Sequence, residues 1–229
     1  MKKLLLTALL LLLFATPAHA ITMFGYDFED TAFSDNATLV DGKLDYWGFS
    51  KWGYVITGND NVDVDTALNG PDLYAHIEGK VNNANIKSAY TVDVEFLDNY
   101  LFNGIGDDLT VWERGQPEPM NVALFDPRTQ NFTSNILFGS IRVGELPDSV
   151  DVSPGVNVAG IDFSLWGIPE DVVINKIRLS SWGVGDPSPD IAAIGGLNSR
   201  ATSTAIPEPS SLLLFGTSLL GLAFRRKHS

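Results

Sequence analysis

The chain has 229 residues, no cysteine and a formal net charge of −13. The absence of cysteine excludes disulfide bonds, thiolate metal sites and a cysteine nucleophile. Between Ile21 and Ile206 there are 10 Lys and Arg against 27 Asp and Glu, which gives this part a net charge of −17. Such a surface repels nucleic acid and anionic lipid, so we expect no nucleic-acid partner.

The first segment, residues 1–20, has the three parts of a secretory signal peptide. It opens with Met-Lys-Lys, continues with an apolar run over residues 4–14, and ends with small residues at Ala18 and Ala20, the two positions that determine cleavage. The apolar run is too short to cross a hydrocarbon core of about 30 Å. The sequence therefore predicts export, with cleavage by signal peptidase after Ala20.

Residues 21–198 are predicted to form one all-β domain, a single β-sandwich of jelly-roll type. Apolar and polar residues alternate along Val92, Val94 and Phe96, which is typical of strands with one buried face and one face in water. Gly, Asn, Asp and Pro separate these short runs, and no stretch holds a helical apolar period over three turns. The predicted strands are 52–56, 92–96, 109–112, 122–125, 136–143 and 172–179.

Aromatic residues gather near the start of this domain. Trp47, Trp52 and Tyr54 lie close together in the sequence, next to Tyr46. If they are exposed on a sheet face, they are candidates for stacking on the sugar rings of a polysaccharide. The alternative is packing in the core, where aromatic side chains bury large areas.

The sequence offers little material for catalysis. His76 is the only histidine between the two end segments, and without cysteine the usual pairs of nucleophile and base cannot be assembled from it. The sequence has no glycine-rich phosphate loop, HExxH helix or GxSxG elbow. We therefore expect His76 to be a packed or surface residue and the protein not to be an enzyme.

Carboxylates on two loops are the candidate metal ligands. Asp107 and Asp108 follow a glycine-rich loop and precede a strand that ends near Glu113, and Asp190 lies in a second loop rich in Pro and Gly. Oxygen ligands on loops suit Ca²⁺, so these four residues are a candidate Ca²⁺ site. Two alternatives stay open: aspartates that form turns, and an acid pair of the kind that hydrolyses glycosides.

The carboxy-terminal end is predicted to consist of a linker and a membrane-anchoring helix. Residues 199–206 are small and polar, and they are followed by Pro207, Glu208 and Pro209. The apolar stretch 210–224 comes next, and as a helix it rises about 22 Å, which makes it a short membrane span. The stretch ends in three basic residues, Arg225, Arg226 and Lys227, which favour a cytoplasmic end for the helix.

This tail, residues 207–229, resembles the PEP-CTERM sorting signal of exported proteins from Gram-negative bacteria that make exopolysaccharide. The resemblance lies in the Pro-Glu-Pro motif, the apolar helix and the basic end, in that order. It implies that a membrane-embedded exosortase recognises the tail and cleaves near the motif. The protein would then pass through the inner membrane transiently and reach the cell surface or the extracellular space.

The interior also resembles surface domains that PEP-CTERM proteins carry. The similar segments are 98–113, 159–168 and 189–198, and the resemblance implies a β-sandwich module without an assigned function. Together these features predict a non-catalytic surface or matrix protein, associated with exopolysaccharide or biofilm and binding carbohydrate. The alternatives are a secreted glycan-active enzyme that uses paired carboxylates and a self-associating adhesin.

Overall fold

Strands make up nearly all of the regular structure, as the alternating apolar residues predict. The computed structural model describes residues 21–29, 32–50, 53–56, 73, 75–80, 87–146, 155–181 and 188–201. These residues belong to one compact unit, Ala20–Ala201, and apart from strands they hold one short 3₁₀ helix, η1 (Phe163–Trp166). The all-β prediction is therefore confirmed for the described part of the chain.

The predicted signal peptide and sorting tail lie outside the described residues. Both the cleavage site after Ala20 and the apolar helix over 210–224 therefore remain predictions. Among the described residues, no helix is long and apolar enough to cross a membrane.

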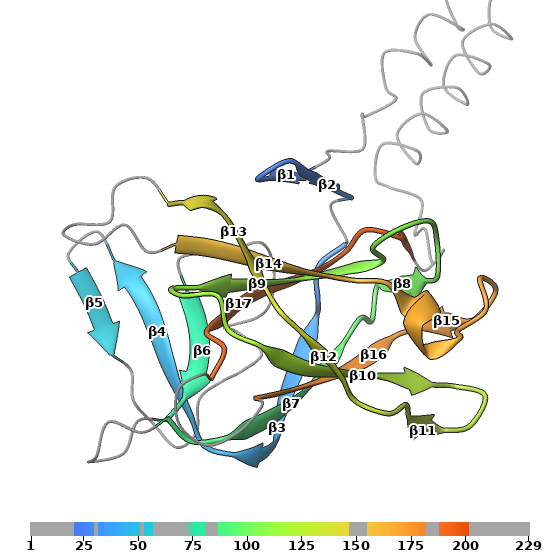
Figure 1. Cartoon of the computed structure of the whole chain (residues 1–229), viewed down its shortest axis with the longest axis horizontal. Helices are drawn as coiled ribbons and strands as arrows, with labels where there is room; N and C mark the ends of the chain where they lie inside the picture. The colour runs from blue at the N-terminus through green and yellow to red at the C-terminus, as the bar shows by residue number, and fades with distance from the viewer. Residues whose placement is uncertain are drawn as a thin grey trace, which may run out of the picture. The chain divides into compact units, whose positions relative to one another are not determined.

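One layer of the fold is a six-stranded antiparallel sheet (Figure 1). Its order is β11-β10-β16-β7-β3, and β12 pairs with β10 beside this path. Its strands are β3 (Asn36–Gly42), β7 (Tyr90–Glu95), β10 (Met120–Asp126), β11 (Asn131–Phe132), β12 (Ile136–Phe138) and β16 (Lys176–Ser181). Strands far apart in the sequence, such as β3, β7 and β16, therefore lie next to one another.

The second layer is a seven-stranded antiparallel sheet of order β13-β14-β9-β17-β6-β4-β5. Its strands are β4 (Leu44–Ser50), β5 (Gly53–Ile56), β6 (Ala75–Gly79), β9 (Leu109–Arg114), β13 (Ile141–Glu145), β14 (Gly155–Ile161) and β17 (Ile191–Gly196). Strands β9 and β17 lie near its middle, and β5 and β13 form its edges.

Two small sheets complete the domain. Strands β1 (Ile21–Met23) and β2 (Tyr26–Phe28) form a hairpin. A three-stranded sheet has the order β15-β8-β18, with β15 (Val173–Ile174), β8 (Asn99–Phe102) and β18 (Ser199–Ala201). The sequence placed residues 199–201 in the linker because they are small and polar, but their backbone pairs with β8, so they belong to the folded domain.

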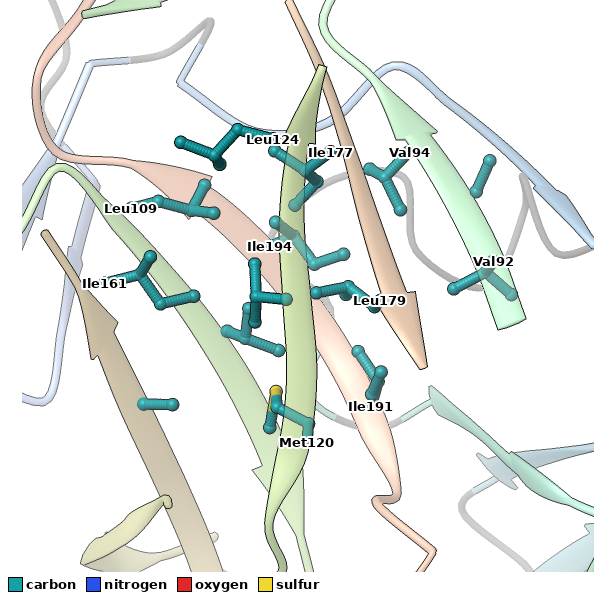
Figure 2. Close-up of a cluster of buried hydrophobic side chains, with 14 of the residues drawn as sticks. Val92, Val94, Leu109, Met120, Leu124, Ile161, Ile177, Leu179, Ile191 and Ile194 are labelled. Atoms are coloured by element: carbon teal, nitrogen blue, oxygen red, sulfur yellow. The ribbon is translucent and has the colours of Figure 1, made fainter. Parts of the chain in front are cut away.

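The main core lies between the two large sheets. On β7, Val92 and Val94 are fully buried, as the alternation of β7 predicts. Figure 2 shows these valines together with Ile177 and Leu179 from the six-stranded sheet, packed against side chains from the other sheet such as Ile194. Two sheets that share one core in this way form a β-sandwich.

A second apolar cluster covers the outer face of the seven-stranded sheet. Trp112 of β9 is fully buried at its centre, and the rings of Phe24, Tyr26 and Phe28 lie 6.1, 5.5 and 6.3 Å from its ring. The amino-terminal hairpin therefore packs over this face. As a result, every residue of β9 and β17 is buried, and alternation in their sequences does not reveal which face is the core.

Candidate functional site

The structure divides the four predicted Ca²⁺ ligands between the two ends of β9. Asp107 and Asp108 precede the strand, and Glu113 is its fifth residue. At about 3.3 Å per residue, the five steps along the strand from Asp108 to Glu113 span roughly 16 Å. Asp190 lies at the Glu113 end, because its carbonyl oxygen accepts a hydrogen bond from the Arg114 N–H at 2.9 Å. The four carboxylates therefore do not surround one common point.

Asp108 acts as a junction between three loops. Its side chain is fully buried. Its Oδ1 accepts hydrogen bonds from the Gly104 N–H at 2.6 Å and from Asn198 Nδ2 at 2.7 Å, and its Oδ2 accepts one from the Phe163 N–H at 2.7 Å. Donors of the protein thus occupy both oxygens, which favours the interpretation of this aspartate as a loop-forming residue.

Asp107 is exposed beside this junction. Its pKa is raised from the ordinary value, first by partial burial and then by the nearby charges of Asp162 and Asp108. These three carboxylates repel one another, and the hydrogen bonds of Asp108 leave it little capacity for a shared ion.

Glu113 is buried on the core side of β9. It alternates with Trp112 and Arg114, and Trp112 faces the outer cluster, so Glu113 faces the interior. Its Oε2 accepts hydrogen bonds from the Glu118 N–H at 3.2 Å and from the hydroxyl of Ser140. Burial raises the pKa of Glu113 to about 8. These two hydrogen bonds lower the pKa, and the charge of Glu118 raises it further.

A buried amide faces Glu113 from the neighbouring strand. Asn157 of β14 pairs directly with Glu113, and both side chains are fully buried. Within the described ranges, Glu113 Oε1 and Asn157 Oδ1 have no hydrogen-bond partner. The side chain of Glu118 hydrogen-bonds to Glu113 and raises its pKa. Two carboxyl groups in such contact need a hydrogen between them, and a protonated Glu113 carries one. The neutral carboxyl at pH 7 is therefore the form that these surroundings favour.

A second buried group joins β6 to the loop before β17. Ile77 of β6 faces the main core, so its neighbours His76 and Glu78 lie on the opposite face of the sheet. The Nζ atom of Lys87 lies 3.0 Å from Glu78 Oε2 and 2.8 Å from Asp190 Oδ1. One donor atom each of His76, Glu78 and Asp190 lies within 4.8 Å of the other two.

The charges in this group act strongly on one another. Burial raises the pKa of Asp190 to about 8, although Lys87 opposes the shift. Burial, with the charges of Arg114 and Lys87, lowers the pKa of His76 to about 3, so its imidazole is neutral at pH 7. Burial alone would lower the pKa of Lys87, but the carboxylates of Asp190 and Glu78 raise it above its ordinary value.

The sequence pointed to Asp190 in this group but not to its partners. His76 is buried, as a packed histidine would be. The available signal was its spacing, because His76 and Glu78 flank an apolar residue on a strand and must share a face. Nothing in the sequence indicated that Asp190 and Lys87 would lie beside that face.

The predicted aromatic positions can be placed only by backbone register. Trp47 of β4 pairs with His76 on one side and with Ile56 of β5 on the other, and Tyr54 pairs with Phe49. Trp47 and Tyr54 therefore belong to the β4–β5 hairpin at one edge of the seven-stranded sheet, whereas Trp52 lies outside the described residues.

Comparison with known proteins adds one specific match. Residues 205–227 match the PEP-CTERM protein-sorting motif, which includes all six residues predicted from the sequence to form the signal. The chain is thus an all-β protein that carries a PEP-CTERM sorting motif after its folded domain. This motif implies export and processing by an exosortase.

The other comparisons do not extend this result. No curated protein matches the chain. Among solved structures, the chain is similar to a family 28 carbohydrate-binding module described as specific for non-crystalline cellulose. The identity is 16%, the TM-score is 0.32, and the match covers 58% of this chain and 78% of the module. Similarity at this level does not indicate what the present chain binds.

Proposed function

We propose that the chain is an exported, non-catalytic β-sandwich module that an exosortase processes and that remains at the cell surface or in the extracellular matrix. The PEP-CTERM match at residues 205–227 carries this proposal. The last strand, β18, ends at Ala201, so the motif follows the folded domain closely. The predicted signal peptide over 1–20 supports the same route, since an exported chain needs an amino-terminal signal as well as its sorting tail.

The positions of the carboxylates support a non-catalytic role. A glycosidase holds two carboxyl groups about 5–9.5 Å apart on either side of the bond that it cleaves. Asp108 and Glu113 are separated by roughly 16 Å of strand, and both are buried. This arrangement favours a structural use of both groups over the glycan-active alternative.

Substitution of the sorting motif tests the export route. We expect Pro207→Ala, Glu208→Ala and Pro209→Ala together to prevent processing, because the exosortase would no longer recognise the tail. The protein should then accumulate with its tail in the membrane fraction, as measured by mass spectrometry of membrane and released fractions. A matched control with Ser203→Ala and Thr204→Ala in the linker should be processed normally. Equal release of the two variants would contradict the proposal.

We further propose that the bound partner is an extracellular polysaccharide that stacks on Trp47, Trp52 and Tyr54. The support is that two of these positions, Trp47 and Tyr54, belong to the β4–β5 hairpin at the sheet edge. Sugar rings present apolar faces that pack on exposed aromatic rings. The high negative charge of the domain also favours an uncharged glycan over an anionic one.

A binding assay on exopolysaccharide from the producing cells tests this partner. Replacement of all three aromatic residues by alanine should weaken binding by about tenfold or more, which corresponds to ~1.4 kcal/mol. Tyr100→Ala is the matched control, because Tyr100 is an exposed aromatic residue on β8, in a different sheet. Release of reducing ends would instead indicate the glycan-active enzyme, and concentration-dependent self-association without glycan would indicate the adhesin.

A further inference from the structure

We propose that His76, Glu78 and Asp190 form a binding site for a divalent transition-metal ion such as Zn²⁺, which displaces the ammonium group of Lys87. This site lies apart from Asp107 and Asp108, and it includes an imidazole that the expected Ca²⁺ site lacked. The inference is independent of exosortase processing and of polysaccharide binding.

The donor set suits zinc better than calcium. One imidazole nitrogen and two carboxylate oxygens approach within 4.8 Å of one another. Donors around a tetrahedral zinc ion lie roughly 3.3 Å apart, because each bond is about 2.0–2.2 Å long. Side-chain shifts of about 1 Å therefore close the site around one ion. Ca²⁺ and Mg²⁺ prefer oxygen ligands alone, whereas imidazole suits zinc and its neighbours.

The backbone holds these donors in place. His76 and Glu78 are two residues apart on β6 and share one face of the sheet. Strand β17 pairs with β6 through Ile191 and Ile77, which sets Asp190 beside Glu78 at the start of β17. His76 and Glu78 lie on a strand, which positions donors more accurately than a loop does, and Asp190 directly precedes β17.

Lys87 already occupies the position of a cation in this group. Its Nζ contacts both carboxylates and donates a hydrogen bond to the carbonyl oxygen of Ser188 at 3.3 Å. One ammonium thus serves two carboxyl groups, and burial raises the pKa of one of them, Asp190, to about 8 even beside this ammonium. A divalent ion in the same place balances both carboxylates.

Titration of the purified full chain tests the site, after treatment with EDTA. We expect one Zn²⁺ per chain by calorimetry and a rise in melting temperature, because a ligand that binds only the folded state stabilises it. Co²⁺ should give a visible absorption band of a site with nitrogen and oxygen ligands. Ca²⁺ at the same concentration should give neither signal.

Three variants separate a metal site from a structural ion pair. His76→Gln should weaken Zn²⁺ binding by at least about tenfold, whereas His19→Ala with His228→Ala should leave it unchanged. Lys87→Met should strengthen Zn²⁺ binding and enlarge the rise in melting temperature, since it removes the competing ammonium. This gain does not require that His76→Gln folds. Absence of Zn²⁺ binding in both the wild type and Lys87→Met would overturn the proposal, as would equal binding by the wild type and His76→Gln.

Discussion

Replacement of Asp108 by alanine should lower the free energy of unfolding by about 3–5 kcal/mol. The substitution leaves three donors without their acceptor: the N–H groups of Gly104 and Phe163 and the side-chain amide of Asn198. Each unpaired donor of this kind costs about 1–3 kcal/mol, and the larger values apply to buried ones. Urea unfolding of the purified chain, followed by circular dichroism, measures the change.

The neighbouring aspartate provides a matched control for this effect. Asp107 is exposed, and its pKa is raised first by partial burial and then by the nearby charges of Asp162 and Asp108. Asp107→Ala should therefore change the stability by less than about 1 kcal/mol. If the two aspartates instead held Ca²⁺, both alanine variants would lose a Ca²⁺-dependent rise in melting temperature. A small effect of Asp108→Ala would show that the loop junction is not important for stability.

The strands of this protein could be predicted where one face meets water. On β7, Val92 and Val94 alternate with Thr91 and Glu95, and the structure confirms a strand with one buried face. Alternation fails on β9, because the amino-terminal hairpin covers the outer face of Trp112 and the main core covers the inner face. A strand buried on both sides carries no periodic signal that identifies its faces.

The candidate sites depend on pairing between distant segments, which a single sequence does not reveal. Ile191 pairs with Ile77, more than a hundred residues earlier in the chain, and this pairing brings Asp190 to Glu78. The separation of Asp108 from Glu113 could have been foreseen, because the predicted strand between them fixes a long distance. The length of the predicted strand already indicated that Asp108 and Glu113 lie too far apart to bind one ion, which the composition of the loops did not indicate.

The buried carboxyl of Glu113 should make the protein less stable as the pH rises from about 4.5 to about 8. Its ordinary pKa is 4.5 and burial raises it to about 8 in the folded protein, so the folded state binds more protons than the unfolded state in this interval. The stability that protonated Glu113 contributes is complete below pH 4.5 and is lost by about pH 8. The expected loss is on the order of a few kcal/mol, since one pKa unit corresponds to about 1.36 kcal/mol.

Replacement of Glu113 by glutamine should remove this loss. The amide oxygen can still accept hydrogen bonds from Ser140 and from the Glu118 N–H, and the amide nitrogen can donate to the carboxylate of Glu118, which hydrogen-bonds to the side chain of Glu113 in the wild type. The variant should therefore equal the wild type near pH 4 and exceed its stability at pH 8 and above, as measured by urea unfolding across this range. Glu170→Gln, at an exposed position, should give a profile parallel to that of the wild type. The stability difference between Glu113→Gln and the wild type could instead stay constant from pH 4 to pH 9. This result would mean that folding does not shift the pKa of Glu113. The assignment of a neutral, buried carboxyl to Glu113 would then be wrong.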